Sequence, residues 1–436
     1  MFLQNAIEKR INDDNPVKVA LIGAGKFGSM FLSQVPSTIG IEVLVIADLK
    51  PENAIKACEN VGWSDDLINK TKFVDKGADA IKLNEVEVVI EATGFPAAGI
   101  EHARQAFQNG KHIIMVNVEA DVLAGAALAK EANSVGVVYS MAYGDQPALT
   151  AEIVEWARAS GFNVTSAGKG TRYQPIYHKS SPDTVWDYYG LTHEEARKAG
   201  MNPKMFNSFL DGTKSGLEMA AIANACDLEV PTNGLLFPPC GMDDLANILK
   251  PLEFGGLLEK NGQVEVVSSL ERDGRPVFKD LRWGVYAVLE APNDYAASCF
   301  KQYGMNTDDT GKYSAMYKPF HLIGMELNIS VFSAALLNQA TGQTKKFTGD
   351  VVSTTKKNLK KSEILDGEGG ATVWGKLVPS KLSLSMEALP IGLAHGIKLK
   401  NEIKENKIIT WNDVDFSSND PAISYRRKME KDFRKS

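Results

Sequence analysis

Three glycines near the start of the chain have the spacing of a turn that approaches a diphosphate. Gly23, Gly25 and Gly28 follow an apolar run at residues 17–22 and precede a segment with helical spacing of large apolar residues. Asp48 stands twenty positions after Gly28, at the end of a second apolar run. In such a strand–turn–helix unit, the glycines admit the pyrophosphate and the acidic residue binds the adenosine ribose. The pattern therefore predicts a nicotinamide dinucleotide site; the alternative is a glycine turn without a ligand.

Other residues are expected around the same dinucleotide. Asp48 favours NAD(H), because a carboxylate repels the 2′-phosphate of NADP(H), whereas Lys50 could pair with that phosphate. The residues alone leave this choice open. Residues 92–94 and 117–119 end later apolar runs and are expected to face the cleft, although an ordinary strand-to-helix turn would look the same. The expected cofactor-binding residues, besides the three glycines and Asp48, are Lys26, Phe27, Lys50, Ala92, Thr93, Gly94, Asn117 and Glu119.

Two polar segments further along could act on a carbonyl or hydroxyl group. Lys169 lies between two glycines, and Asp211, Lys214 and Glu218 lie within fifty residues of it. A lysine can donate a proton to a carbonyl that is being reduced, and a carboxylate can position that lysine or bind Mg²⁺ or Mn²⁺. We predict these four residues to be catalytic and the two carboxylates to be metal ligands. The alternative is a surface pair of Lys214 and Glu218, four residues apart on a helix.

Cations near these segments could bind an anionic group of a substrate. Arg172, Lys179 and Lys204 could bind it, as could His321, which is expected at the start of a long apolar helix. A histidine beside Phe320 and Leu322 could equally be a packing residue.

Strand and helix patterns alternate five times before residue 147, which predicts a doubly wound parallel sheet of the Rossmann type. Residues 148–345 lack this alternation and are expected to form an α+β substrate domain, whose helix at residues 317–340 packs back on the first domain. Residues 346–436 are expected to form a small, mostly β module with a solvated basic tail. The expected fold class is therefore α/β, in three domains.

Composition excludes several classes of protein. The net charge of −6 argues against nucleic-acid binding. No apolar run is long enough to span a membrane, and the first fifteen residues lack a signal-peptide core, so a cytoplasmic location is expected. The four cysteines form no Cys-x-x-Cys pair, which fits a reducing compartment.

Several motifs together resemble homoserine-dehydrogenase-like oxidoreductases with a C-terminal SAF domain. They are GAGKFG, EATG, FNSFLDGTKSGLEMA, GDQPA and YKPFHLIGMEL, with DGEGG, GKLVP and LPIGL in the last ninety residues. This group includes the second type of 1-deoxy-D-xylulose 5-phosphate reductoisomerase, an enzyme of isoprenoid precursor synthesis. The acidic and lysine residues that homoserine dehydrogenases carry further along are not found here.

The resemblance implies an NADP(H)-dependent reductoisomerase that isomerises and reduces a small phosphorylated carbonyl compound with a divalent cation. A homodimer is expected by the same analogy. The alternatives are a homoserine-type or sugar-acid dehydrogenase and, from another class, a cofactor-binding regulatory or scaffold protein.

Overall fold

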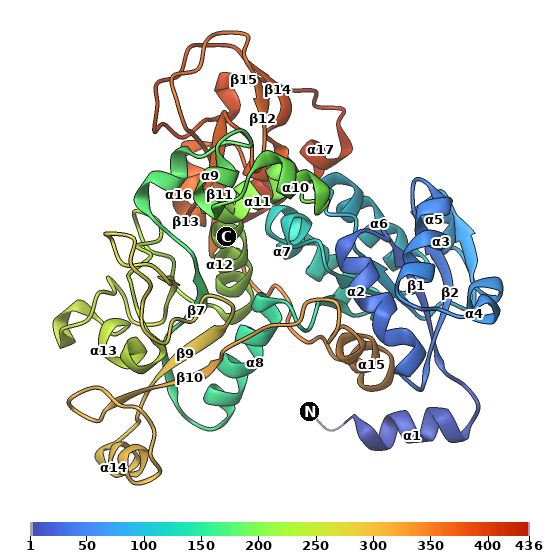
Figure 1. Cartoon of the computed structure of the whole chain (residues 1–436), viewed down its shortest axis with the longest axis horizontal. Helices are drawn as coiled ribbons and strands as arrows, with labels where there is room; N and C mark the ends of the chain where they lie inside the picture. The colour runs from blue at the N-terminus through green and yellow to red at the C-terminus, as the bar shows by residue number, and fades with distance from the viewer. Residues whose placement is uncertain (1–2, 435–436) are drawn as a thin grey trace. The chain divides into compact units, whose positions relative to one another are not determined.

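The apolar runs of the first 150 residues form one six-stranded parallel sheet in the computed structural model of the chain (Figure 1). The structure describes residues 3–434. The strand order β3-β2-β1-β4-β5-β6 changes direction between β1 and β4, which confirms the predicted doubly wound α/β fold. The strands are β1 (Val17–Ile22), β2 (Ile41–Ala47), β3 (Lys72–Val74), β4 (Val88–Glu91), β5 (His112–Met115) and β6 (Tyr139–Met141).

Helices connect these strands and belong to the same compact unit, which comprises residues 1–152 and 321–345. The core includes apolar residues of the strands, Phe31 and Leu32 of a helix that packs on them, and Val331 and Phe332 of a later helix. The helices are α1 (Gln4–Asn12), α2 (Lys26–Gln34), α3 (Pro51–Asn60), α4 (Asp65–Lys70), α5 (Gly77–Ile81), α6 (Pro96–Gln108), α7 (Val118–Ser134), α15 (Asn328–Leu337) and α8 (Gln146–Ala159), whose last turns enter the second unit.

Two expected elements differ in the structure. The long helix expected from residue 317 is a strand that ends at Lys318, a turn, and then the shorter helix α15. Pro319 and Gly324 lie in that turn, and Gly324 has φ +79°, a conformation that ends a regular helix. The strand β3 was not expected, because its three residues carry too short an apolar pattern.

The second unit comprises residues 153–320 and 346–436. It contains a four-stranded mixed sheet, order β10-β9-β7-β8. Helix α12 contacts β7 and β8 of this sheet and also β11 and β13 of a smaller one. Thirteen of its fourteen residues are buried, as expected of a helix that is covered all round. The elements up to β10 are β7 (Asn163–Thr171), α9 (Val185–Tyr189), α10 (His193–Lys198), α11 (Pro203–Leu210), α12 (Thr213–Cys226), α13 (Leu245–Ile248), β8 (Gln263–Ser268), β9 (Val285–Glu290), α14 (Asp294–Gln302) and β10 (Tyr313–Lys318).

The last ninety residues form two small antiparallel sheets, β11-β13 and β12-β14-β15. The basic tail, expected to be solvated, is instead the helix α17 as far as it is described; residues 435 and 436 lie outside the described part. Arg426 of this helix is fully buried and pairs with Asp350 (2.5 Å) and Glu430 (2.9 Å). The elements are β11 (Gly349–Thr355), β12 (Ile364–Asp366), β13 (Val373–Pro379), α16 (Ser380–Met386), β14 (His395–Leu399), β15 (Val414–Asp415) and α17 (Pro421–Phe433).

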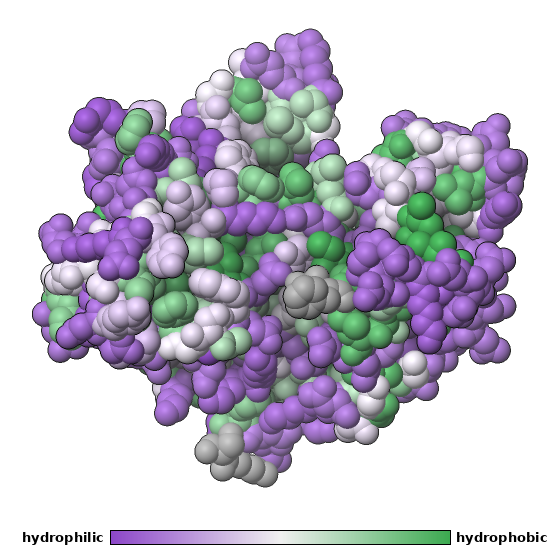
Figure 2. Space-filling view, turned by 90° about the horizontal axis from the view of Figure 1, so that it is seen from below, coloured by the Kyte–Doolittle hydropathy of each residue, from purple (hydrophilic) through white to green (hydrophobic). Residues whose placement is uncertain are grey.

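Hydrophilic residues occupy most of the face shown in Figure 2, and apolar residues form separate groups between them. No helix in residues 3–434 combines the length and the apolar character that crossing a lipid bilayer requires.

Candidate functional site

The glycine turn of the first unit leaves room for a diphosphate. Gly25 is the N-cap of α2, and a Cβ built on it meets no atom within 4 Å. Gly23 and Gly28 are required for another reason: a Cβ atom on either residue would clash with a backbone atom. Gly23 has φ +96°, and its Cβ would lie 2.8 Å from the Ala92 carbonyl oxygen; a Cβ on Gly28 would lie 2.2 Å from that of Gly23. The turn thus packs tightly on its inner side and is open where a pyrophosphate would meet the helix N-terminus.

Asp48 extends this cradle from the end of β2. Its Oδ2 accepts a hydrogen bond from the Ala24 amide (3.1 Å), and its Oδ1 accepts one from the Lys50 amide (3.1 Å). These bonds fix the carboxylate beside the glycine turn, where a ribose hydroxyl would find an acceptor. Lys50 is exposed. The glycine turn and Asp48 therefore fit a nicotinamide dinucleotide, which supplies or accepts a hydride when bound.

The end of β4 lies beside the turn, because Ile22 of β1 pairs with Glu91 of β4. Glu91 is fully buried, and its Oε1 accepts the Thr93 hydroxyl proton (2.5 Å) and lies 3.2 Å from His102 Nδ1. The other oxygen, Oε2, is buried without a hydrogen-bond partner. This cluster holds Thr93 in place at the point where the strand order changes direction.

Asn117 and Glu119 were expected at the end of a strand, but β5 ends at Met115 and α7 begins at Val118. Asn117 is the buried N-cap of α7. Its Oδ1 accepts from the Ala120 amide (3.0 Å), and its Nδ2 donates to the Phe95 carbonyl (2.9 Å). Glu119 lies in the first helical turn. Lys26 and Gly94 are exposed, whereas Phe27, Ala92 and Thr93 are partly buried.

In the second unit, β7 and α12 bring two of the predicted catalytic residues into contact. The Lys169 ammonium on β7 donates to the Glu218 carboxylate on α12, and both side chains are at least nine-tenths buried. Gly168 and Gly170 flank Lys169, and Cβ atoms there would lie 1.9 Å from the carbonyl oxygens of Glu265 and Leu281. Only glycine therefore fits on either side of this lysine.

Asp211, at the end of α11, pairs with a lysine that the sequence analysis did not single out. Its Oδ2 lies 2.7 Å from Lys356 Nζ, and its Oδ1 accepts from the Thr213 amide (2.8 Å). Lys356 is buried and also donates to the carbonyls of Ser180 and Gly370 (2.7 Å each). One buried ammonium thus joins the segment before α11, the start of α12 and the C-terminal strands.

The two carboxylates predicted to bind a metal ion do not form a shared site. Asp211 and Glu218 each face a different lysine, whose charge opposes that of a divalent cation. No three His, Cys, Asp or Glu side chains converge within residues 3–434 in a way that would hold a metal. This donor set does not fit Mg²⁺ or Mn²⁺.

The cations predicted to bind an anionic substrate are dispersed. Arg172 donates to the Tyr188 carbonyl (3.0 Å), and Lys204 donates to the Asp366 carbonyl (3.0 Å). Lys179 is largely exposed and pairs with Glu405 (2.7 Å). Lys214 lies in the first turn of α12 and is partly exposed. His321, expected at a helix start, lies instead in the turn after β10, in the first unit.

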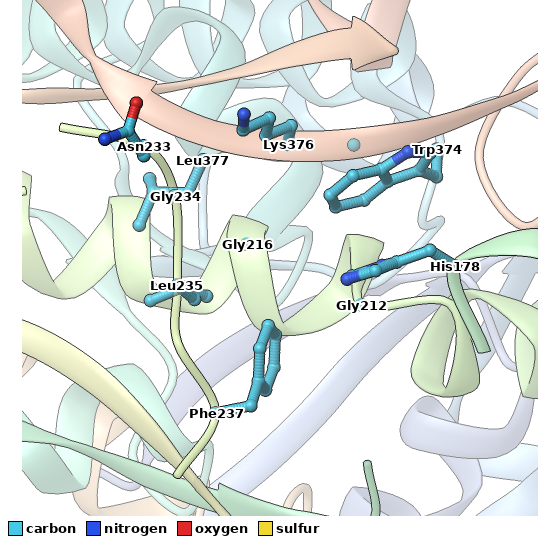
Figure 3. Close-up of a pocket in the computed structure, with 11 residues that line it drawn as sticks. His178, Gly212, Gly216, Asn233, Gly234, Leu235, Phe237, Trp374, Lys376 and Leu377 are labelled. Atoms are coloured by element: carbon cyan, nitrogen blue, oxygen red, sulfur yellow. The ribbon is translucent and has the colours of Figure 1, made fainter. Parts of the chain in front are cut away.

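A pocket of about 210 Å³ opens in the second unit between α12 and β13 (Figure 3). Its walls carry aromatic rings and one ammonium group above a helix that presents glycines. None of the predicted substrate-binding cations lines it. The lining residues are His178, Gly212, Gly216, Asn233, Gly234, Leu235, Phe237, Trp374, Gly375, Lys376 and Leu377.

Two family models match the chain along consecutive segments. Residues 23–142, which hold the glycine turn, Asp48 and Thr93, match the homoserine dehydrogenase NAD binding domain. Residues 144–327, which hold Lys169 and Glu218, match the catalytic domain of oxidoreductase DRL. The chain thus carries a segment similar to an NAD binding domain, followed by a segment similar to an oxidoreductase catalytic domain. Its C-terminal residues from 328 onward lie outside both matches.

Among solved structures, this chain is similar to a myo-inositol dehydrogenase from Lactobacillus casei in complex with NAD(H) and myo-inositol. The two are 16% identical with a TM-score of 0.30, over 39% of this chain and 50% of that chain. A levoglucosan dehydrogenase in complex with NADH is 20% identical with a TM-score of 0.28, over 38% of this chain and 46% of that chain. The chain thus spans about half the length of these structures. No match was found among curated proteins.

Sequence reasoning missed the residues that the C-terminal segment contributes to the second unit. Lys356, Trp374 and Lys376 lie more than 130 residues after Glu218, and no spacing rule connects them to it. No motif in the sequence connects His178 to Asp211, yet the His178 Nδ1 donates to the Asp211 carbonyl (2.7 Å). The nearest sequence signal is Gly375-Lys376, a glycine beside a cation, as at Gly168-Lys169.

Proposed function

We propose that this oxidoreductase reduces a small phosphorylated or polyhydroxy carbonyl compound, and that 1-deoxy-D-xylulose 5-phosphate is the first substrate to test. The observation that carries the proposal is the buried Lys169–Glu218 pair inside the segment that matches the DRL catalytic domain. The motifs that resemble the second type of reductoisomerase run through the same segment and support that substrate class.

In this proposal Lys169 donates a proton to the substrate oxygen that becomes negative as the carbonyl is reduced. Glu218 holds the ammonium in place, which is an ordinary role of a carboxylate beside a general acid. The glycines on both sides of Lys169 fix the strand against its neighbours, so the ammonium position is set by backbone contacts. A dinucleotide bound at the glycine turn would supply the hydride.

The choice of dinucleotide is part of the proposal. The resemblance favours NADP(H), whereas the Asp48 carboxylate, fixed by two backbone amides, favours NAD(H). Lys50 is exposed two residues later and could pair with a 2′-phosphate. We propose NADP(H) as the first cofactor to test, with NAD(H) as the comparison.

The test is an absorbance assay of the purified full chain with 1-deoxy-D-xylulose 5-phosphate and NADPH or NADH, in EDTA and separately in Mg²⁺ or Mn²⁺. Substrate-dependent loss of the reduced-nicotinamide absorbance supports the proposal and identifies the cofactor. Activity in EDTA is expected, because the carboxylates face lysines; strict dependence on Mg²⁺ or Mn²⁺ would show that these side chains rearrange around a metal. No oxidation of either dinucleotide would reject this substrate.

A second candidate is a homoserine-type dehydrogenase, which the match of residues 23–142 favours. Assaying homoserine with NAD⁺ and NADP⁺ separates the two activities, because homoserine carries no phosphate and is oxidised rather than reduced. Turnover of homoserine without turnover of the sugar phosphate would replace the first proposal.

A further inference from the structure

The pocket between α12 and β13 is built from two parts of the chain. His178, Gly212 and Phe237 belong to the segment that matches the DRL catalytic domain, whereas Trp374 and Lys376 come from a strand outside both family matches. Trp374 and Lys376 are two residues apart on β13, so their side chains leave the same face of the strand. Figure 3 shows this strand above α12, with Trp374 opposite His178.

The charge of the pocket is positive. Lys376 carries the only full charge among its eleven lining residues, which include no Asp or Glu. Within residues 3–434 the Lys376 ammonium has no hydrogen bond or ion pair with a protein group. Burial lowers the pKa of His178, so that ring is neutral near pH 7. An anion that entered would therefore meet a cation that no carboxylate neutralises.

The aromatic walls are held rigidly. The His178 ring stacks on Trp374 with centroids 4.0 Å apart, and Phe237 stacks on Tyr173 at 4.0 Å. His178 Nδ1 donates to the Asp211 carbonyl (2.7 Å), and Nε2 accepts from the Tyr173 hydroxyl (2.9 Å). Because both ring nitrogens are engaged, His178 acts as a wall of the pocket. Such fixed rings suit the carbon skeleton of a ligand.

The pocket has its volume because several of its lining residues are glycines, whose missing side chains leave the space open. Four glycines line the pocket: Gly212 at the N-cap of α12, Gly216 within α12, and Gly234 and Gly375. The volume of about 210 Å³ corresponds to roughly seven waters at the density of the liquid, or to a phosphate or carboxylate group with a few carbons.

We propose that this pocket binds a small organic anion, with the phosphate or carboxylate at Lys376 and the carbon chain against Trp374 and Phe237. The inference rests on the proposed function in one respect: it assigns the anionic group of the substrate to a lysine of the C-terminal segment. An effector with the same chemistry would use the same contacts. The C-terminal strands are thereby part of a binding site and are not an appended module.

The test uses the full chain labelled with 5-fluorotryptophan and observed by ¹⁹F NMR, with the Trp374 resonance assigned through Trp374→Phe. Glycerol 3-phosphate is the probe, and glycerol is the uncharged control. We expect the phosphate to shift the Trp374 resonance and glycerol to leave it unchanged. Lys376→Met should weaken the binding about tenfold or more, because a charge-assisted hydrogen bond is lost, whereas Lys376→Arg should retain it. Lys381→Met, which removes an exposed lysine nearby, is the matched control and should bind as the parent does.

An unchanged Trp374 resonance, or a shift that is equal in the parent and in Lys376→Met, overturns the proposal. This measurement needs no turnover, so it stands or fails separately from the proposed reaction. Where the chain does turn over a carbonyl substrate, glycerol 3-phosphate distinguishes the two sources of the anion. Competitive inhibition with an unchanged kcat assigns the pocket to the substrate, and a changed kcat assigns it to an effector.

Discussion

At the scale of single residues, the charged side chains that were predicted to be catalytic form specific ion pairs in the structure. Lys169 and Glu218 were each expected to act on the substrate, and the fold brings them together from β7 and α12. Lys214, expected on the same helical face as Glu218, lies one turn earlier, and Glu218 pairs with Lys169 instead. A buried ion pair is weak support for stability, since desolvation opposes it, which favours a functional reason for placing one here.

Replacing Lys169 with methionine should abolish most turnover while dinucleotide binding continues. Removing a positioned proton donor costs about 10²–10⁴-fold in rate, and the glycine turn lies in the other unit. The measurements are kcat with the best substrate and the affinity for NADPH by fluorescence titration. Lys198→Met removes an exposed lysine of the same unit and should leave both values unchanged.

A structural role for Lys169 makes a different prediction. Lys169→Met leaves the Glu218 charge buried and alone, which costs about 3–5 kcal/mol, and the double variant with Glu218→Gln should recover much of that stability. If the double variant also recovered turnover, Lys169 would be a structural residue and its assigned role would be wrong.

At the scale of elements, the glycine turn permits a matched comparison. Gly28→Ala places a Cβ 2.2 Å from the Gly23 carbonyl oxygen, so β1 and α2 must separate, and we expect a lower Tm and loss of dinucleotide binding. Gly25→Ala meets no atom within 4 Å. It should keep the parental Tm and weaken only dinucleotide binding, because its methyl group enters the space that a pyrophosphate would occupy. Thermal melts with and without NADPH measure both effects, and equal behaviour of the two variants would contradict this reading.

The elements of the two units differ in how well the sequence could predict them. The strands of the first unit are continuous apolar runs bounded by Gly and Asp, so local pattern was sufficient to find the sheet and the glycine turn. The second unit is held by contacts between distant residues, such as Lys356 with Asp211, 145 positions apart. Hydrophobic periodicity carries no information about such pairs. The prediction of a solvated basic tail was wrong for the same reason, because Arg426 pairs with Asp350, which lies 76 residues earlier in the chain.

Helix α17 should therefore contribute strongly to the stability of the second unit. Arg426 is fully buried between Asp350 and Glu430. Arg426→Met leaves the buried Asp350 carboxylate without its cation, whereas Glu430 keeps its ion pair with Arg427 (2.6 Å). We expect a loss of about 3–5 kcal/mol in the free energy of unfolding, measured by urea denaturation. Lys428→Met, on the same helix, should change it by less than about 0.5 kcal/mol. A loss that small for Arg426→Met would restore the original view of a solvated tail.

At the scale of the whole molecule, two buried acids make stability depend on pH. Burial raises the pKa of Glu265 to about 7 and that of Asp121 to about 6. Both values lie above those of the unfolded chain, so the folded state binds more protons than the unfolded state in the interval between them. The contribution of these two carboxyl groups to the free energy of unfolding is fully present below about pH 4, and it is lost as the pH rises to about 7. Asp121 belongs to the first unit and Glu265 to the second, so each unit has its own dependence.

Glu265 provides the sharper test, because its carboxylate accepts backbone hydrogen bonds from Leu236 and Phe237, in the loop that lines the α12–β13 pocket. Trp63 is the only one of the six tryptophans in the first unit, so Trp63→Phe leaves fluorescence that reports on the second unit alone. In that background the free energy of unfolding should fall by up to about 3 kcal/mol between about pH 5 and about pH 8. The glutamine of Glu265→Gln cannot titrate. In that variant the free energy of unfolding should therefore lose most of this pH-dependent decrease. Equal decreases in the two proteins would mean that Glu265 is ionised throughout and that its backbone hydrogen bonds outweigh its burial.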